Sequence, residues 1–490
     1  MPVKSIDALA QLWRDAGLPA ASLSRLGLTG SEPLLPSTFA VGTAAQVTVA
    51  ASALAAAEIW RLRTGRVQEV TVDMRHALIE SRSERYLRVE GRPEPAPWDP
   101  LTGAYRCGDG RWVRIHAGFP HHRAAAAKLL ARGDAGLATA LEQALAGSAR
   151  FAEGSRQRED DRAMVERALE RYTAQAFEDE AAEAGLVAGM MRSFAEWDAH
   201  PQAKAVAELP LVAIEKIGEA PAEALPAAAR PLAGVRVLDL TRVIAGPVCG
   251  RTLAAHGADV LNVSAPHLPN MAPLVIDTGR GKLATQLDLR TAPDRGKLES
   301  LLRDSTIFVQ SYRPGALEQL GFGALAAARI PPGLVYVSLS AYGAKGPWAK
   351  RRGFDSVVQT VSGFNFAEGE ASGSFGPLPL PNQALDHGAG YLMAFGCLAA
   401  LHRRITEGGS WLVRISLAGT GRWLRGLGRV QNGLACHDLG MDQVRDLLEE
   451  MPSGFGRLTA VRHSAQMSET PPRWTRPAVP LDTHPPCWPE

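Results

Sequence analysis

Asp386 combines a carboxylate with small neighbours in a pattern that suits covalent acyl chemistry. Gly388 and Gly390 follow it, and the predicted helix that begins here continues to Leu401. Backbone N–H groups and the positive dipole end of a helix stabilise an ionised carboxylate or a developing oxyanion. A carboxylate can attack a thioester to give a mixed anhydride, which the released thiolate converts into an enzyme thioester. Asp386 is therefore the candidate nucleophile, with a helix N-cap as its alternative role.

An internal repeat tests whether packing alone requires an acid at this place. Residues 398–417, a helix, a glycine turn and a strand, match residues 54–74 when a one-residue gap is allowed. The first copy has Gly42 or Thr43 at the Asp386 position, and the residues around them include no carboxylate. This difference favours a chemical role for the acid in the second copy. The histidine that follows Asp386 is expected at the rim of the site rather than as its base.

Length and composition indicate a globular enzyme with more than one domain. The chain has 490 residues, of which 46% are hydrophobic and 21% charged, and its formal net charge is +2. So small a net charge argues against nucleic acid or a membrane surface as partner. It still allows a local cluster of basic residues that binds a small acidic ligand. No apolar leader opens the sequence, and the run from Ala44 to Ala57 is too short to span a membrane, so we expect a cytoplasmic protein. The chain has five scattered cysteines: Cys107, Cys249, Cys397, Cys436 and Cys487. Because none of them forms a CxxC pair, we predict reduced thiols and no zinc site.

The second half of the chain carries the pattern of a parallel sheet. Residues 216–231 are rich in Ala and Pro, lack a periodic apolar face and are predicted to be a linker. Strands are then predicted at 235–240 and 259–263 around a helix at 248–256, and further strands follow. We therefore predict that residues 232–490 form a Rossmann-like, doubly wound large domain with a C-terminal tail.

The first half of the chain reads as a smaller α+β domain. Residues 36–215 contain the degenerate first repeat and a hairpin at 105–116 around a Gly-Asp-Gly turn. Ala-rich helices are predicted on either side of this hairpin, and residues 1–35 are predicted to be a helical extension. The predicted fold class is accordingly α/β, with a large doubly wound domain and a smaller α+β domain.

Four stretches, in their order and spacing, resemble class III CoA-transferases, the family of formyl-CoA transferase, carnitine CoA-transferase and α-methylacyl-CoA racemase. They are residues 231–247 with 257–260, residues 312–321, residues 343–363 and residues 386–401. The family keeps its nucleophilic Asp at the position of Asp386. Segments similar to the family's small domain lie upstream of the large-domain stretches, so the chain resembles a rearranged or fused member.

The resemblance implies that the chain binds coenzyme A, as an acyl-CoA substrate, without a metal. The residues expected to contact coenzyme A, or to shape its site, are Val243, Ile244, Ala245, Arg280, Lys282, Arg313, Arg352 and Asp355. The loop at 243–247 lacks the G-x-G-x-x-G pattern of nicotinamide-binding domains, and Pro247 is expected to start a helix that faces a phosphate. Arginine pairs well with phosphate oxygens, whereas solvated surface cations are the blander alternative for these basic residues. For Asp355 the alternative is a helix cap.

The sequence departs from the family's pattern at two places. Ser264 and Ala265 stand where the family has an acidic and then a basic residue, and Phe354 stands where racemases carry a histidine. Without that histidine, deprotonation at an α-carbon lacks one of its two bases. Histidines 116, 121 and 122 lack ligand partners in the sequence and are expected to be surface residues rather than a metal site.

The resemblance implies a CoA-transferase that moves CoA between an acyl-CoA and a free carboxylic acid through an aspartyl intermediate. It also implies a homodimer. A non-catalytic CoA-binding paralogue and an acyl-CoA racemase or isomerase are the alternatives.

Overall fold

The computed structural model describes residues 2–94, 99, 101–147, 156–374 and 376–489. The chain divides into two compact units. The large unit comprises Met1–Glu94, Leu209–Ser340 and Pro381–Glu490, and the small unit comprises Pro95–Glu208 and Ala341–Leu380. These units do not follow the predicted boundaries, because the first 94 residues belong with the second half of the chain.

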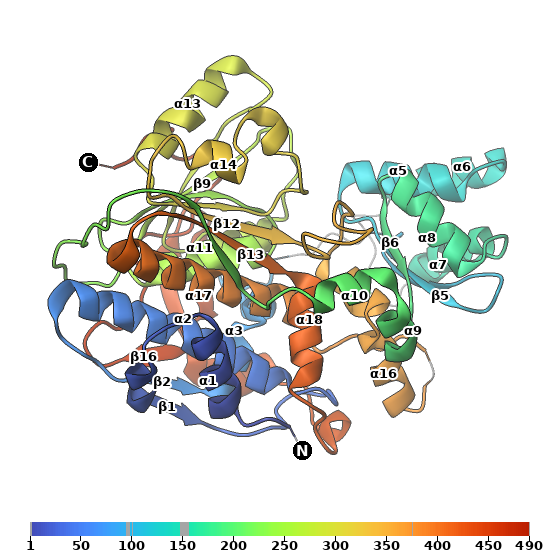
Figure 1. Cartoon of the computed structure of the whole chain (residues 1–490). Helices are drawn as coiled ribbons and strands as arrows, with labels where there is room; N and C mark the ends of the chain where they lie inside the picture. The colour runs from blue at the N-terminus through green and yellow to red at the C-terminus, as the bar shows by residue number, and fades with distance from the viewer. Residues whose placement is uncertain (1, 95–98, 100, 148–155, 375, 490) are drawn as a thin grey trace. The chain divides into compact units, whose positions relative to one another are not determined.

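A seven-stranded sheet forms the centre of the large unit (Figure 1). In spatial order its strands are β10 (Lys282–Gln286), β9 (Asp259–Ser264), β8 (Arg236–Leu240), β11 (Ile307–Gln310), β12 (Val335–Ser340), β13 (Ser410–Ser416) and β7 (Ala213–Gly218). All neighbours are parallel except β7, which is antiparallel to β13. The first six strands have the doubly wound order, which confirms the predicted α/β class. The predicted linker 216–231 is wrong at its start, since residues 216–218 hydrogen-bond within this sheet.

Helices cover both faces of the large sheet. One face packs against α11 (Ala245–Ala255) and α17 (Ala384–Glu407). The other face carries the apolar side chains of α13 (Ala292–Arg303) and α14 (Ala324–Ala327). Helix α17 is long and apolar enough to cross a membrane by length and composition, but its apolar window is 100% buried. That burial is typical of the core helix of a soluble protein.

The internal repeat is visible as two helices of equal length that lie side by side, α17 and α2 (Val41–Thr64; Figure 1). Each has 24 residues and is followed by a glycine with φ of 71°, Gly65 or Gly408, and then by a strand. Because the helix starts and the glycines are separated by the same number of residues, the copies align without the predicted gap. Thr43, rather than Gly42, therefore stands at the Asp386 position.

Strand pairing explains why the N-terminal 94 residues belong to the large unit. Strand β2 (Val70–Asp73) lies between β1 (Leu26–Thr29) and the C-terminal strand β16 (Ala465–Met467). Likewise, β15 (Gly456–Val461) pairs with β14 (Leu448–Ser453) and with the short β3 (Arg88–Val89). Backbone groups of these distant segments satisfy one another, so the predicted extension 1–35 and the C-terminal tail are parts of one unit. Helix α1 (Ser5–Asp15) packs on α2, and α3 (Met74–Glu80) and α4 (Ser83–Tyr86) follow β2.

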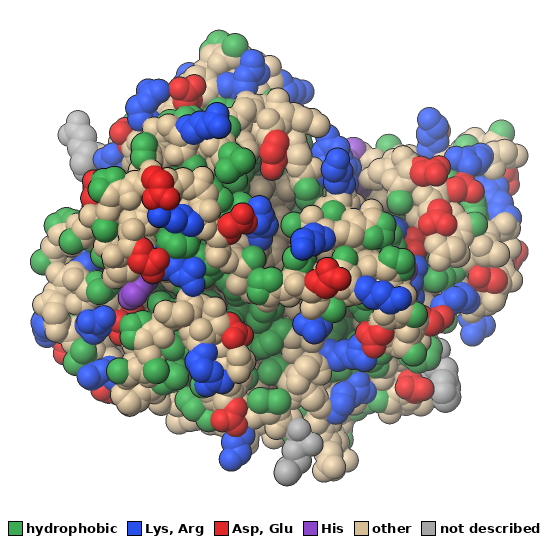
Figure 2. All heavy atoms as spheres, in the orientation of Figure 1, with side chains coloured by type: hydrophobic (Ala, Val, Ile, Leu, Met, Phe, Trp, Pro, Cys, Tyr) green, Lys and Arg blue, Asp and Glu red, His purple; other side chains and the backbone are tan. Residues whose placement is uncertain are grey.

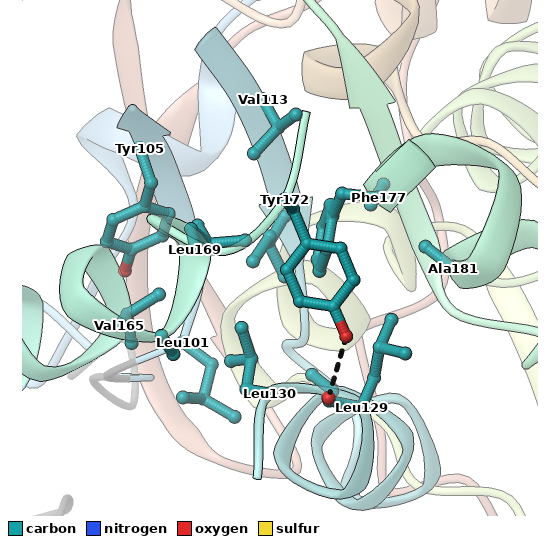
Figure 3. Close-up of a cluster of buried hydrophobic side chains, with 14 of the residues drawn as sticks. Leu101, Tyr105, Val113, Leu129, Leu130, Val165, Leu169, Tyr172, Phe177 and Ala181 are labelled. Carbon is teal, nitrogen blue, oxygen red and sulfur yellow. Dashed lines mark hydrogen bonds between the residues drawn. The ribbon is translucent and has the colours of Figure 1, made fainter. Parts of the chain in front are cut away.

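The small unit is an α+β structure built on the predicted hairpin. Strands β4 (Gly103–Arg106) and β5 (Trp112–His116) are antiparallel, which confirms the hairpin, and β6 (Val187–Met190) adds a third strand. Figure 3 shows its core, where Tyr105, Val113 and Phe177 meet leucines from the surrounding helices. Those helices are α5 (Pro120–Leu130), α6 (Ala135–Gly147), α7 (Arg156–Leu169) and α8 (Ala174–Glu183).

Residues 341–380 correct the prediction that the whole of 232–490 forms the large domain. They leave the large sheet after β12 and return only at α17. Their helix α15 (Asp355–Val361) packs against β5 and β6 of the small unit. The apolar face of this insertion is therefore buried in the small unit. On the face drawn in Figure 2, basic and acidic side chains are interspersed, in keeping with the net charge of +2.

Close contact between α11 and α17 depends on one glycine. A Cβ atom placed on Gly390 would lie 2.5 Å from the carbonyl oxygen of Ala245 and 2.8 Å from Cβ of Val248. On Gly388, two residues earlier, the nearest atom would be Cγ2 of Thr420 at 3.2 Å. Gly390, one of the small residues that follow the candidate nucleophile, is therefore needed for the packing of α17 on α11.

An ionic cluster without solvent access joins distant segments of the large unit. Asp277 accepts hydrogen bonds from Arg251 at 2.6 Å and from Arg280 at 2.9 Å, and all three side chains are buried. Nearby, Glu80 accepts hydrogen bonds from the backbone and hydroxyl of Ser464 at 2.7 and 2.6 Å. Burial by itself raises the pKa of Glu80, but His463, Arg251 and the Ser464 hydroxyl lower it to about 2, against an ordinary value of 4.5. The ionised form of Glu80 is thus favoured by folding.

Glu80 should make unfolding depend on pH in a defined window. Because its pKa is lower in the folded protein, its stabilising contribution is complete above pH 4.5 and is lost as the pH falls to about 2. Glu80→Gln should lower the free energy of unfolding by about 3 kcal/mol near neutral pH, and this deficit should shrink through that window. Denaturant unfolding of both proteins across pH 3 to 7 measures it. A deficit that stays constant with pH would contradict the assignment.

The two glycines of α17 provide a matched pair for testing its packing. Gly390→Ala should destabilise the protein by about 1–3 kcal/mol, because the added methyl group meets backbone of α11 that cannot move aside. Gly388→Ala should be close to neutral, since the gain in helix propensity of about 1 kcal/mol offsets a tight contact with one methyl group. Thermal unfolding of both variants measures this difference. Equal effects would show that Gly390 does not limit the helix contact.

Candidate active site at the carboxyl edge of the large sheet

The topology of the large sheet defines one edge as the place for a ligand. Strands β8 and β11 are neighbours, and their outgoing connections leave in opposite directions. In doubly wound sheets, ligands bind at this switch point, beyond the carboxyl ends of the strands. Val243 lies in the loop after β8 and Arg313 lies in the loop after β11, and the backbone N–H of Arg242 donates to Ser311 at 3.4 Å between these loops.

Asp386 lies at the same edge. Helix α17 connects β12 to β13, which are parallel, so its first turn lies at the carboxyl ends of the strands. Asp386 is the third residue of this helix and its side chain is buried, with 7% of its surface exposed. The N-cap position belongs to Gln383, so the N-cap alternative for Asp386 is wrong. Carboxylates in the first helical turn are stabilised by the helix dipole.

The loop before α11 has a strained backbone. Val243 has φ of 74°, and a β-branched residue in this left-handed region is a conformational outlier. Strain of this kind is typical of binding sites and active sites, where the surrounding fold holds it. Helix α11 begins at Ala245, so Ile244 is its N-cap and Pro247 is its third residue rather than its first. Since Gly390 packs on Ala245, the start of α11 lies about one helical turn along α17 from Asp386.

Arg280 and Lys282 are buried ion-pair partners, so the surface-cation alternative is wrong for both. Lys282 Nζ donates to Asp239 Oδ2 at 2.8 Å and to the carbonyl of Pro247 at 2.9 Å. Arg280 donates to Asp277 and to the carbonyl of Val461, and its guanidinium lies 4.1 Å from the centre of the Trp474 ring. These contacts stabilise the fold, and a role for either residue in phosphate binding stays a prediction.

Arg313, in contrast, is exposed at the switch point. Arg352 and Asp355 belong to the small unit. Arg352 is exposed and donates to the carbonyl of Gly185 at 3.3 Å, whereas Asp355 is buried, begins α15 and accepts a hydrogen bond from Gln359. Phe354 is the N-cap of α15, so Asp355 is not the cap that one alternative predicted.

The histidines of the small unit form part of an aromatic cluster. His116 stacks on Phe354 with 4.1 Å between ring centres, and His122 is buried beside the same phenylalanine. Burial, with a smaller contribution from Arg114, lowers the pKa of His116 to about 4. The expectation of a surface histidine is therefore wrong for His122. Among the residues that the structure describes, no group of three His, Cys, Asp or Glu side chains could hold a metal.

The helix start in the first repeat copy also has a carboxylate beside it. Glu32 Oε1 accepts a hydrogen bond from the backbone N–H of Thr43 at 2.8 Å. Burial raises the pKa of Glu32, although hydrogen bonds from Thr43 and Gly42 oppose this effect. The sequence comparison missed it because Glu32 precedes the repeat. The inference that packing requires no acid in the first copy therefore has to be corrected.

His387 and Glu84 form a contact that the sequence did not indicate. His387 Nε2 lies 3.0 Å from Glu84 Oε2, and only 1% of the histidine is exposed. The prediction that His387 lies at the rim of the site is therefore wrong. Glu84 follows no recognisable motif, and only the folding of α4 against α17 brings the two side chains together.

Comparison with known proteins gives the same family in both halves. The family model of CoA-transferase family III matches residues 5–230 and 232–447. The acetyl-coenzyme A transferase nodX of Hypoxylon pulicicidum is 36% identical over 199 residues, which cover 40% of this chain and 34% of that protein. Formyl-CoA:oxalate CoA-transferase of Streptomyces coelicolor is 33% identical over 201 residues, which cover 39% and 48%.

A solved relative shows similar coverage. The crystal structure of Rv3272 from M. tuberculosis has 32% sequence identity and a TM-score of 0.37, and the match covers 40% of this chain and 56% of that one. The chain thus spans about a third to a half of the length of the curated relatives it matches. The family model accounts for nearly all of residues 5–447, and the chain belongs to CoA-transferase family III.

Proposed function

We propose that the chain transfers CoA between an acyl-CoA and a free carboxylic acid, with Asp386 as the nucleophile. The observation that carries this proposal is a buried carboxylate in the first turn of α17, at the ligand-binding edge of a doubly wound sheet. Membership of CoA-transferase family III supports it. The names of two relatives, an acetyl-coenzyme A transferase and a formyl-CoA:oxalate CoA-transferase, specify the same class of reaction.

The proposed reaction proceeds through two acyl exchanges on Asp386. A carboxylate oxygen attacks the thioester carbonyl, the C–S bond breaks, and CoA leaves as its thiolate, which gives a mixed anhydride. The thiolate then attacks the Asp386 carbonyl carbon and releases the donor acid, which leaves an aspartyl-CoA thioester. The acceptor carboxylate repeats these steps in reverse order. Backbone N–H groups in the first turn of α17 can stabilise the oxyanion at each stage.

The switch point offers the features that a CoA phosphate requires. The start of α11 presents backbone N–H groups, and Arg313 adds an exposed guanidinium on the adjacent loop. Arg280 and Lys282 contribute less directly, since their charges are paired inside the protein. We also propose a homodimer, as the resemblance to the family implies, and a cytoplasmic location, as expected from the sequence.

A non-catalytic CoA-binding protein is the second candidate. The internal pairing of Lys282 and Arg280 favours it. Four cations were expected to hold CoA, and the charges of these two are already paired with buried aspartates. Such a protein would bind acyl-CoA without forming a covalent adduct. Whether Asp386 forms a covalent adduct therefore distinguishes the two candidates.

Incubation with an acyl-CoA should give a covalent adduct on Asp386. Hydroxylamine should trap it as a hydroxamate that peptide mass spectrometry assigns to this residue. Asp386→Asn should lower kcat by about 10³-fold or more, because the amide cannot act as the nucleophile. Glu32→Gln is the matched control, since Glu32 lies beside the equivalent helix start, and it should retain adduct formation. CoA binding without an adduct over a broad acyl-CoA panel would favour the non-catalytic candidate.

Arg313→Ala should raise the KM for acyl-CoA about tenfold, as expected for the loss of one charge-assisted hydrogen bond to phosphate. The effect should disappear with acyl-pantetheine substrates, which lack phosphate. Arg303→Ala is the control, because Arg303 is an exposed arginine on α13 that pairs with Glu299. Steady-state kinetics with both substrates measures the difference. An equal penalty on the phosphate-free substrate would show that Arg313 does not contact phosphate.

A further inference from the structure

The first turn of α17, which carries Asp386, is not secured by its own cap residue. Gln383 occupies the N-cap position, and its side chain makes no cap hydrogen bond within the described part of the chain. N-cap bonds contribute about 1 kcal/mol and keep the first turn from fraying. A nucleophile in that turn needs another source of rigidity.

Three hydrogen bonds to the segment Ser81–Glu84 bracket Asp386. Before it, Asn382 Nδ2 donates to the carbonyl and hydroxyl oxygens of Ser81 at 3.2 and 2.9 Å. After it, His387 Nε2 donates to Glu84 Oε2 at 3.0 Å, since a carboxylate can only accept. Both Asn382 and His387 are buried. The two contacts therefore fix the chain on either side of the nucleophile.

The segment Ser81–Glu84 is itself anchored in the ionic cluster. Ser83 Oγ donates to Asp277 Oδ2 at 2.6 Å and lies 2.9 Å from Arg251 Nη1, which donates to it. Ser83 is fully buried. A continuous series of hydrogen bonds and covalent links thus runs from Asp277 through Ser83 and Glu84 to the first turn of α17.

His387 acts on Asp386 through the helix rather than at the reacting atoms. Successive helical residues point about 100° apart, so neighbours in sequence do not share a face. His387 faces Glu84 of the N-terminal segment. It is a positioning residue by this geometry, and the same holds for Asn382.

The first repeat copy secures its helix start differently. Its N-cap, Ala40, has no side chain that could cap α2, and the Glu32 carboxylate binds the backbone N–H of Thr43 instead. A local carboxylate thus stabilises the start of α2, where the second copy has Asp386 in the turn itself. A second carboxylate placed there would repel Asp386, whereas the contacts at Asn382 and His387 bring no further charge to the side of the turn that carries Asp386.

We propose that the segment Ser81–Glu84 is a clamp that positions Asp386, so that the N-terminal segment of the chain completes the reactive turn of the second repeat. This inference rests on the proposed role of Asp386. It assigns a function to residues outside the family motifs that the sequence displays.

The clamp is tested by Glu84→Ala and Glu84→Gln. Glu84→Ala should lower kcat by about 10- to 100-fold while the KM for acyl-CoA stays within about twofold, because the carboxylate is misplaced but CoA contacts are unchanged. Glu84→Gln should recover most of the loss, since its amide oxygen can still accept from His387. Asp446→Ala is the control, because Asp446 pairs with Arg75 and likewise joins the N-terminal segment to the C-terminal one. It should keep its kcat.

Amide hydrogen exchange of the peptide that contains His387 and Gly388 gives a readout independent of activity. Exchange should become faster in Glu84→Ala, and it should stay unchanged in Asp446→Ala and Glu84→Gln. Unchanged kcat and exchange in Glu84→Ala, or an equal loss in Asp446→Ala, would overturn the clamp. A wild-type protein that forms no adduct would overturn the proposed function alone, and the exchange measurement would still decide the clamp.

Discussion

The buried ionic cluster around Asp277 is the interaction on which the large unit depends. Two arginines and a serine hydroxyl surround one carboxylate that has no access to water. Charges in such a place are tolerated only when all partners are present, so the segments that carry Ser83, Arg251 and Arg280 must assemble together. This requirement joins the N-terminal 94 residues to the doubly wound sheet, because Ser83 contacts both Asp277 and Arg251. It also sets the place of the segment that contacts the start of α17.

The two repeat copies show that one architecture can serve two purposes. Helices α2 and α17 have equal lengths, the same terminal glycine and a following strand, and they pack against each other. Their starts differ in where the carboxylate originates. Glu32 comes from outside its helix and is used in hydrogen bonds to it, whereas Asp386 is part of the turn. The contrast between the copies therefore concerns how the acid is held and not whether one is present.

The basic residues that were all expected to contact CoA have different physical roles in the structure. Lys282 and Arg280 were both expected to contact CoA, yet each is paired with an aspartate in the interior. Arg313 lies on an exposed loop at the switch point. A basic residue can bind phosphate only if its charge is not already neutralised by a buried partner, and that condition depends on tertiary contacts.

The sequence by itself determined the α/β class, the hairpin at 105–116, the repeat and the family, because periodicity, turn residues and motif spacing are local properties. It also identified Asp386 as an acid at a helix start. The tertiary structure alone decided which segments form each unit, that Gly390 serves packing, and that Glu32, Glu84 and His387 have partners far away in the chain. Those features depend on contacts between residues that no local pattern relates, and burial then decides which charges are paired and which are free to bind a ligand.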